Sequence, residues 1–216
     1  MFVSHSIRSL TGDQLDLLPS DQDILRFKEL GWHMSPVIIP PSVLNSAVEG
    51  ADALMSGEVD CEIDGWPSSI DDKESSLINI EFASIQNSRI RQLANYPIIA
   101  ATAAKLSGAK ELRLFADSLI CKKSIPADDM SAQGTKSVVG WHTDKAYWPT
   151  CTSDKMLTAW IPLVDCTIDM GPLIYLDGSH LWSNDKEIKE ALSFRDNTED
   201  FNTCLLYTSP SPRDRG

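Results

Sequence analysis

Residues 140–144 read GWHTD, and this stretch decides both the fold class and the chemistry. The segment 138–144 is predicted to be a strand, and residues i and i+2 of a strand face the same side. His142 and Asp144 are therefore predicted to point together into whatever the sheet encloses. There they would offer an imidazole nitrogen and a carboxylate oxygen to one metal ion.

Such a pair supplies two of the three ligands in the facial site of non-haem Fe(II) oxygenases, which leaves positions open for substrate and oxygen. The spacing alone is weak evidence. The chain has 4 His and 31 Asp and Glu residues, so an H-x-D pair can arise by chance, and a lone pair is more often structural. The surrounding sequence has to decide between the two readings.

The chain changes character at about Lys110. Short apolar segments follow, separated by turns rich in Pro, Gly and Asp. Several short strands without helices between them indicate an antiparallel sandwich or barrel rather than a parallel α/β sheet. The four predicted strands are residues 111–122, 138–144, 155–164 and 173–176.

The first half of the chain is predicted to be mainly helical. Ser20 and Asp23 form a capping-box signal and Gly31 a stop signal, while Pro97 and Gly108 bracket a later helix. The predicted helices are 21–30, a helix capped by Ser42 that ends at Gly57, 84–95, 97–107 and a surface helix at 184–195. Between them we expect a short strand at 33–39 and an irregular polar segment at 58–79.

The length and composition predict one folded domain. With 216 residues, 42% of them hydrophobic, the chain can bury one sizeable core. Its net charge of −12 repels phosphate backbones and anionic lipid, which argues against nucleic acid and membrane partners. The sequence has neither a membrane-spanning apolar run nor a secretory signal. Five scattered cysteines favour reduced thiols, so a cytoplasmic location is expected.

The C-terminal residues are predicted to be non-native. Residues 204–214 read CLLYTSPSPRD, which corresponds codon by codon to a transposase-type sequencing adapter. Such scars are left out of fold reasoning. We therefore expect one incomplete domain over residues 1–203, a non-native tail over 204–216, and a natural gene that continues beyond Thr203.

The sequence around GWHTD resembles the central block of the phytanoyl-CoA dioxygenase family. Residues 141–149 read WHTDKAYWP and residues 157–180 read LTAWIPLVDCTIDMGPLIYLDGSH. The family shows W-H-x-D, Y-W-P, A-W-I-x-L, an N-G-P-L turn and a P-G-S-H close in the same order. The helical segments 27–57 and 95–108 and the strand 112–124 also follow its order, so the resemblance covers roughly residues 24–183.

Three turn positions depart from the family pattern. Met170 stands where Asn or Asp is usual, Asp177 replaces the customary Pro, and Lys122-Lys123 stands for Lys-Pro. These changes are expected to alter loop shape more than the metal site.

The resemblance implies a double-stranded β-helix, the jelly roll also found in cupins, with N-terminal helices. It also implies an Fe(II)- and 2-oxoglutarate-dependent dioxygenase that uses O2 to hydroxylate an unactivated C–H of a small organic or acyl substrate. Carried over residue by residue, His142 and Asp144 are metal ligands and catalytic residues. The residues implied to bind or attract 2-oxoglutarate or line its pocket are Trp160, Thr143, Ser118 and Lys122.

The third metal ligand is expected to be absent from this chain. In the family the distal His, and the Arg that binds the far carboxylate of 2-oxoglutarate, lie many tens of residues further on. The jelly roll is accordingly expected to lack its C-terminal strands, and the fragment to be inactive. His180 belongs to the G-S-H close, a turn that does not bind metal in the family.

Three other readings remain open. A cupin-like jelly roll could hold a different metal without binding 2-oxoglutarate. A metal-free small-molecule-binding module on the same fold would tolerate loss of His142. A zinc hydrolase would need a water-activating site, and the Y-W-P and A-W-I segments argue against one.

Overall fold

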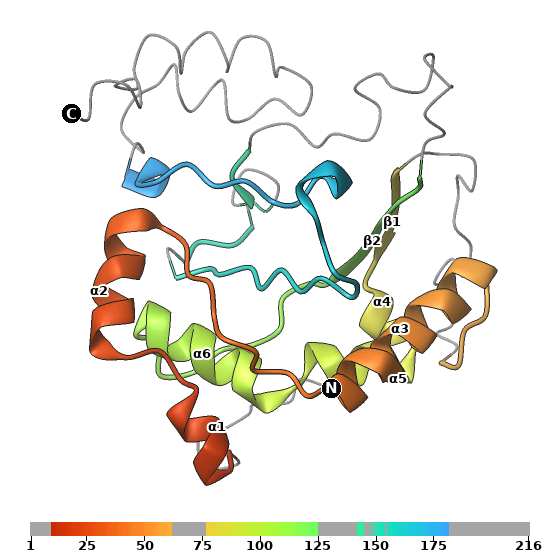
Figure 1. Cartoon of the computed structure of the whole chain (residues 1–216), viewed down its shortest axis with the longest axis horizontal. Helices are drawn as coiled ribbons and strands as arrows, with labels where there is room; N and C mark the ends of the chain where they lie inside the picture. The colour runs from red at the N-terminus through yellow and green to blue at the C-terminus, as the bar shows by residue number, and fades with distance from the viewer. Residues whose placement is uncertain are drawn as a thin grey trace, which may run out of the picture.

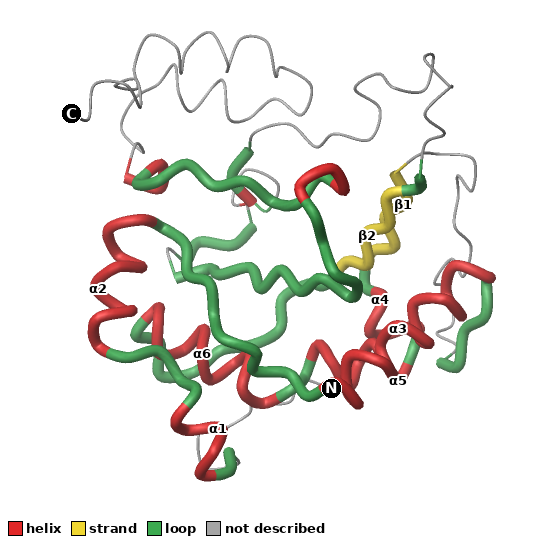
Figure 2. The backbone as a smooth tube through the Cα atoms, in the orientation of Figure 1, coloured by secondary structure: helices red, strands yellow, loops and turns green. Residues whose placement is uncertain are grey.

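The structure is a computed structural model that describes residues 10–61, 77–124, 142–144, 148, 150–153 and 155–181. Within these ranges the helices lie along one side of the molecule, and β1 and β2 pair at one end (Figure 1). Residues 155–181 run across the other side, mostly as loop (Figure 2). No helix in these ranges is long and apolar enough to cross a bilayer.

Local sequence signals explain the first helices. The short α1 (Gly12–Asp16) begins at a Thr11 capping box. The longer α2 (Asp21–Leu30) has the predicted capping box, in which Ser20 and Asp23 satisfy each other's backbone N–H groups. It ends at Gly31, which adopts the left-handed conformation with φ of 85°. The predicted bounds of α2 are therefore confirmed, whereas α1 was not predicted.

The next helix, α3 (Pro41–Ser56), starts one residue before the predicted cap. Pro40 occupies the N-cap position and no side chain caps the helix, so the assignment of Ser42 as the cap was wrong. Proline is favoured in the first turn because it has no N–H to leave unpaired. Gly57 ends the helix as predicted.

The helix predicted at 84–95 is broken into α4 (Ala83–Gln86) and α5 (Ser88–Ala94). Asn87 is extended, and its side-chain oxygen accepts hydrogen bonds from the backbone N–H groups of Arg89 and Ile90. An internal Asn that caps a new helix in this way competes with continuation of the old one. The prediction of one continuous helix was wrong for this reason.

Helix α3 packs closely against α5. A Cβ on Gly50 would lie 2.6 Å from the side-chain oxygen of Asn87 and 3.0 Å from Cβ of Arg89, so only glycine fits at this crossing. The following helix, α6 (Pro97–Ser107), has the predicted bounds and ends at Gly108. Its Ile98 is fully buried.

The described part of the chain contains one antiparallel pair of strands, β1 (Leu77–Glu81) and β2 (Ser118–Lys122). Strand β1 was missed, because its pairing partner lies far away in sequence. Strand β2 is much shorter than the predicted 111–122. The regular pairing ends at Glu81 opposite Ser118, because the next residue, Phe82, has a positive φ of 53° and turns the chain into α4. Asp117 is still held there, since its backbone carbonyl accepts from the N–H of Phe82.

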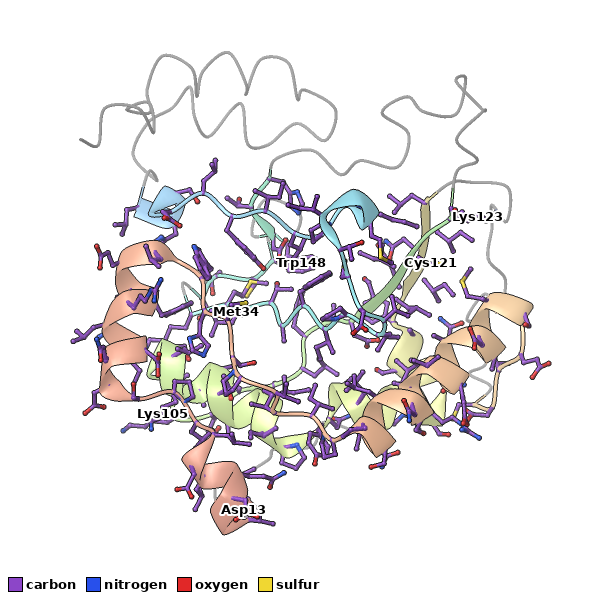
Figure 3. All side chains as sticks on the ribbon, in the orientation of Figure 1. Asp13, Met34, Lys105, Cys121, Lys123 and Trp148 are labelled. Carbon is purple, nitrogen blue, oxygen red and sulfur yellow. The ribbon has the colours of Figure 1, made fainter. Side chains whose placement is uncertain are left out.

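One face of this sheet lies on the core and the other is exposed. The buried core cluster comprises residues of α3, β1, α4 and α5, together with Ile39. Leu119 and Cys121 of β2 pack against it, whereas Ser118, Ile120 and Lys122 face the opposite side. Figure 3 labels Cys121 on this strand.

The other predicted strands within the described residues form no ladder. Residues 33–39, 155–164 and 173–176 have no strand assignment. Pro36 and Pro162 each remove a backbone donor from such a ladder. The described residues thus do not show the mainly β jelly roll. Residues 142–144, the described end of the strand predicted at 138–144, also have no strand assignment, and Asp144 lies in a 3-10 turn. The start of that strand, the helix at 184–195 and the tail at 204–216 lie outside the described ranges.

Candidate metal centre

His142 and Asp144 come together in the structure. Nε2 of His142 lies 3.3 Å from Oδ1 of Asp144, and their side chains are 25% and 39% exposed. The two groups are therefore half-buried but open to a small ligand. The two side chains meet as predicted, although residues 142–144 are not in a strand and Asp144 lies in a 3-10 turn.

The donor atoms of this pair fit a metal ion. Two ligands about 2.1 Å from an ion and at right angles to each other lie about 3 Å apart. The observed 3.3 Å separation is close to that value. A metal would replace the proton that Nε2 of His142 now donates to the carboxylate. Within the described ranges, no group of three or more His, Cys, Asp or Glu side chains is arranged to hold a metal.

A third residue holds the carboxylate from the other side. The hydroxyl of Thr158 donates a hydrogen bond to Oδ2 of Asp144. The hydrogen bond from His142 lowers the pKa of Asp144 most, and Thr158 lowers it further, against the opposing effect of burial. Asp144 is therefore ionised at neutral pH, as a metal ligand must be.

Trp160 lies two residues beyond Thr158. Exposure alternates from Trp160 to Val164, since Ile161 and Leu163 pack on the core cluster while Trp160 and Val164 are exposed by 44% and 60%. Residues 157–160 are all exposed, so the pattern does not extend back to Thr158. Trp160 is thus open to a ligand.

The remaining predicted pocket residues lie on two elements. Thr143 is exposed between the two ligand candidates. Ser118 and Lys122 share the exposed face of β2. Nζ of Lys122 donates to the backbone carbonyl of Gly171 at 2.6 Å, so its charge lies over the turn that follows the 3-10 helix Ile168–Met170.

Tyr175 lies within electrostatic reach of the pair. Burial, and in second place the negative charge of Asp144, raise the pKa of Tyr175. Its ring stacks on Trp32, with centroids 6.1 Å apart and planes 21° from parallel. The Tyr175 phenol therefore stays protonated at neutral pH.

A second aromatic pair includes Trp148, which Figure 3 labels. Its ring meets Phe115 edge to face, with centroids 5.7 Å apart. Trp148 follows Tyr147 in the Y-W-P segment that resembles the family pattern. Tyr147 lies outside the described residues, and Trp148 is half-buried.

His180 contacts the end of α2. Its Nε2 donates to the carbonyl oxygen of Lys28 at 3.0 Å. Its Nδ1 would lie 2.3 Å from a Cβ on Gly31, so the ring fills the space that this glycine leaves. Both ring nitrogens are thus turned toward the helix.

Sequence reasoning missed Thr158, which contacts the pair, and the stacked rings of Trp32 and Tyr175. Thr158 could have been found, because it stands two residues before Trp160 in the A-W-I segment. Tyr175 lies in the predicted strand 173–176, and nothing in that segment marked it as a residue that stacks on Trp32. Trp32 gave no signal, since it lies in a distant N-terminal segment.

Comparison with known proteins identifies the family. The model of the phytanoyl-CoA dioxygenase family matches residues 71–212. No match was found among curated proteins or among solved structures. The matched range contains the His142–Asp144 pair, Thr158, Trp160 and Tyr175, and it spans well over half of the sequence. The chain therefore belongs to the phytanoyl-CoA dioxygenase family, a family of oxygenases.

Proposed function

We propose that this domain belongs to an Fe(II)- and 2-oxoglutarate-dependent dioxygenase that hydroxylates an unactivated C–H of a small organic or acyl substrate. The observation that carries the proposal is the 3.3 Å approach of Nε2 of His142 to Oδ1 of Asp144 within the family match. One nitrogen and one oxygen in this arrangement are the donors of a facial Fe(II) site.

In this proposal His142 and Asp144 would hold Fe(II), together with a distal His that the family resemblance places further along the polypeptide. Thr158 would orient the Asp144 carboxylate by its hydrogen bond. Such outer partners fix the orientation of a ligand and tune its basicity. Asp144 also favours hydroxylation, since some halogenating relatives lack this carboxylate so that chloride can bind the iron.

Fe(II) and 2-oxoglutarate, when bound, supply the oxidising power that activates O2, while the protein orients the substrate and limits water. Trp160 and Thr143 would contribute to the wall of the cosubstrate pocket. Lys122 and Ser118 share one face of β2, where the ammonium group would attract an acidic cosubstrate. The family fold would be a jelly roll whose interior encloses these residues.

The proposed substrate class is broad because the fold does not determine the substrate. The family acts on acyl thioesters, small amino acids and secondary metabolites, and the fold does not select among them. The second candidate function is a cupin-like metal-binding or non-catalytic small-molecule-binding jelly roll. The half-exposed His142–Asp144 pair is compatible with such a site, because it could hold a metal without a cosubstrate.

Succinate formation from 2-oxoglutarate tests the proposal. The experiment requires a full-length protein that includes the expected distal His and Arg. His142→Ala should abolish Fe(II)-dependent succinate formation, because it removes one of three protein ligands. His180→Ala is the matched control and should keep Fe(II) affinity within a fewfold of the parent. Near-normal turnover in His142→Ala, or Fe(II) binding without 2-oxoglutarate binding in the parent, would favour the second candidate.

A further inference from the structure

The apolar residues of β2 do not by themselves determine which face of the strand is buried. Three successive apolar residues, Leu119, Ile120 and Cys121, occupy the middle of the strand. Leu119 and Cys121 pack against the core cluster, whereas Ile120 is 54% exposed. A slip of one residue would bury Ile120 and expose the other two, because successive side chains point to opposite faces. Lys122 adds little to this choice, since it stands at the end of the strand, where a long side chain can still reach solvent. The hydrophobic pattern therefore specifies the register of β2 only weakly.

Asp117, the residue before β2, provides a contact that can fix the register. Its backbone carbonyl accepts from the N–H of Phe82 at 2.6 Å, one step beyond the last regular pair, Glu81 and Ser118. Its Oδ2 accepts from the backbone N–H of Ser84 at 2.8 Å, and its Oδ1 accepts from the hydroxyl of Ser84 at 2.6 Å. Three hydrogen bonds from one residue thus join the start of β2 to the turn that follows β1.

The turn after β1 depends on this partner. Phe82 is the N-cap residue of α4, but its side chain makes no capping hydrogen bond, and its φ of 53° and ψ of 42° are left-handed. A bulky residue adopts this conformation only where the surrounding contacts hold it there. A capping side chain normally accepts from the N–H of the second or third helical residue. Ser84 is the second residue of α4, so Asp117 caps this helix in place of Phe82.

Ser84 is a fixed anchor for Asp117. It is only 4% exposed, and its backbone carbonyl accepts from Nε of Arg91 in α5 at 2.8 Å. The two donors of Ser84 therefore have set positions, and they select the residue of the incoming strand that can meet them. A slip of one residue would put Ala116 or Ser118 opposite Phe82. Neither of these has a carboxylate that could accept both hydrogen bonds.

We propose that Asp117 is a positioning residue that sets the register of β2 and thereby keeps Ser118 and Lys122 on its exposed face. In this register Nζ of Lys122 donates to the carbonyl of Gly171 at 2.6 Å. The register is a property of the sheet and is independent of the reaction. Its consequence for cosubstrate binding rests on the proposed function, in which Ser118 and Lys122 serve on this face.

Disulfide cross-linking of the 216-residue chain reports the register. Asn79 is exposed opposite Ile120, whereas Cys121 faces the core opposite Ile78. A thiol at position 79 therefore lies on the other face from Cys121 in the native register. A slip that puts Ser118 opposite Phe82 would place position 79 directly opposite Cys121, close enough for a disulfide. Asn79→Cys reports this slip, and Leu77→Cys reports the slip in the opposite direction.

Diamide is the oxidant, and the cross-linked peptides are identified by mass spectrometry. With Asp117 intact we expect little cross-linking of either new thiol to Cys121. Asp117→Ala should raise this cross-linking several-fold in at least one of the two reporters. Asp117→Asn keeps one acceptor and should restore much of the native pairing, while Ser84→Ala, which loses only the hydroxyl donor, should have a smaller effect.

Two controls accompany the reporters. The double variant Asn79→Cys/Ile120→Cys should cross-link readily in the native register, because the two positions are paired on the exposed face. This cross-link should fall in Asp117→Ala. Cys166 is outside the sheet and serves as the reference thiol. Equal cross-linking of the new thiol to Cys166 and Cys121 would show unfolding rather than a slip and would contradict the register role.

Unchanged cross-linking in Asp117→Ala that is folded by circular dichroism would overturn the register role. If Asp117→Ala does not fold, Ser84→Ala decides, and cross-linking equal to that of the parent would overturn it. In the full-length protein, Asp117→Ala should weaken 2-oxoglutarate binding several-fold and leave Fe(II) affinity within a fewfold of the parent. A shifted register with unchanged 2-oxoglutarate affinity would overturn the consequence for the cosubstrate alone. No 2-oxoglutarate binding in the parent would overturn the proposed function instead.

Discussion

The hydroxyl of Thr158 donates a hydrogen bond to the Oδ2 atom of Asp144, fourteen residues earlier in the sequence. Oδ1 of the same carboxylate faces Nε2 of His142. One carboxylate oxygen, Oδ2, is thus fixed by the hydrogen bond from Thr158, and the other, Oδ1, remains available to bind a metal ion beside His142. This division suits a monodentate metal ligand whose orientation is fixed before the metal binds.

Loss of the Thr158 hydroxyl should weaken the candidate metal site without removing a ligand. Thr158→Val is expected to lower metal affinity by roughly 10–100-fold, the usual effect of losing an outer partner of a ligand. Thr158→Ser keeps the hydroxyl and is the matched control. Calorimetric titration with Mn(II) or Fe(II) measures both variants. Equal affinities for the parent and Thr158→Val would show that the hydrogen bond has no part in metal binding.

A methyl group at Gly31 should destabilise the protein through His180. Gly31 has φ of 85°, and its Cβ would lie 2.3 Å from Nδ1 of His180. Gly31→Ala should therefore cost about 1–2 kcal/mol for the left-handed backbone and a further ~1–3 kcal/mol for overpacking. Urea unfolding of Gly31→Ala and the parent measures the total.

Gly108→Ala isolates the first of these costs. Gly108 also has positive φ, but nothing lies within 4 Å of its Cβ position. The free energy of unfolding should therefore fall less in Gly108→Ala than in Gly31→Ala. The double variant Gly31→Ala/His180→Ala should recover part of the difference. Equal losses at both glycines would contradict the close packing of His180 on α2.

The contact between Asp60 and Ser88 should give an acid-dependent contribution to stability. Asp60 accepts hydrogen bonds from the backbone N–H and the hydroxyl of Ser88, the first residue of α5. The hydrogen bond from the Ser88 side chain is the main cause that lowers the pKa of Asp60. A carboxylate with a lowered folded-state pKa stabilises the protein above its unfolded pKa and loses this effect as pH falls through the folded value.

Asp60→Ala should therefore cost about 1 kcal/mol at neutral pH, the usual net value of a hydrogen bond. The difference between Asp60→Ala and the parent should begin to shrink below about pH 4, the unfolded pKa, and should vanish as the folded carboxyl, whose pKa is lower, becomes protonated. Urea unfolding from neutral to acid pH measures it, with Asp60→Asn as a control that keeps an acceptor without the charge. A difference that is constant with pH would contradict an ionised Asp60 as the acceptor for Ser88.

The helix ends could be predicted because their signals are local. The Ser20 capping box and the glycines that follow α2, α3 and α6 act within one turn of the helix end, so a short window of sequence contains the cause. The break at Asn87 is also local in origin. It was missed because Asn87 was not recognised as the cap of a new helix.

The sheet and part of the site could not be predicted in the same way. Strand β1 forms because Leu77–Glu81 pairs with β2 some forty residues later in the sequence. The residues of β1 alone contain no signal that identifies this partner. The contacts of Trp32 with Tyr175 and Asp177 likewise join segments more than 140 residues apart. By contrast, His142 and Asp144 could be placed together because they lie two residues apart in the sequence.

The central claim is that His142 and Asp144 hold an iron that chelates 2-oxoglutarate. Anaerobic titration of 2-oxoglutarate into the Fe(II)-loaded full-length protein tests it most directly, because such a chelate gives a visible charge-transfer absorption. We expect a saturable band in the parent, its retention in His180→Ala, and its loss in His142→Ala and Asp144→Ala. An undiminished band in either of the last two variants, or no band in a parent that binds Fe(II), would contradict it.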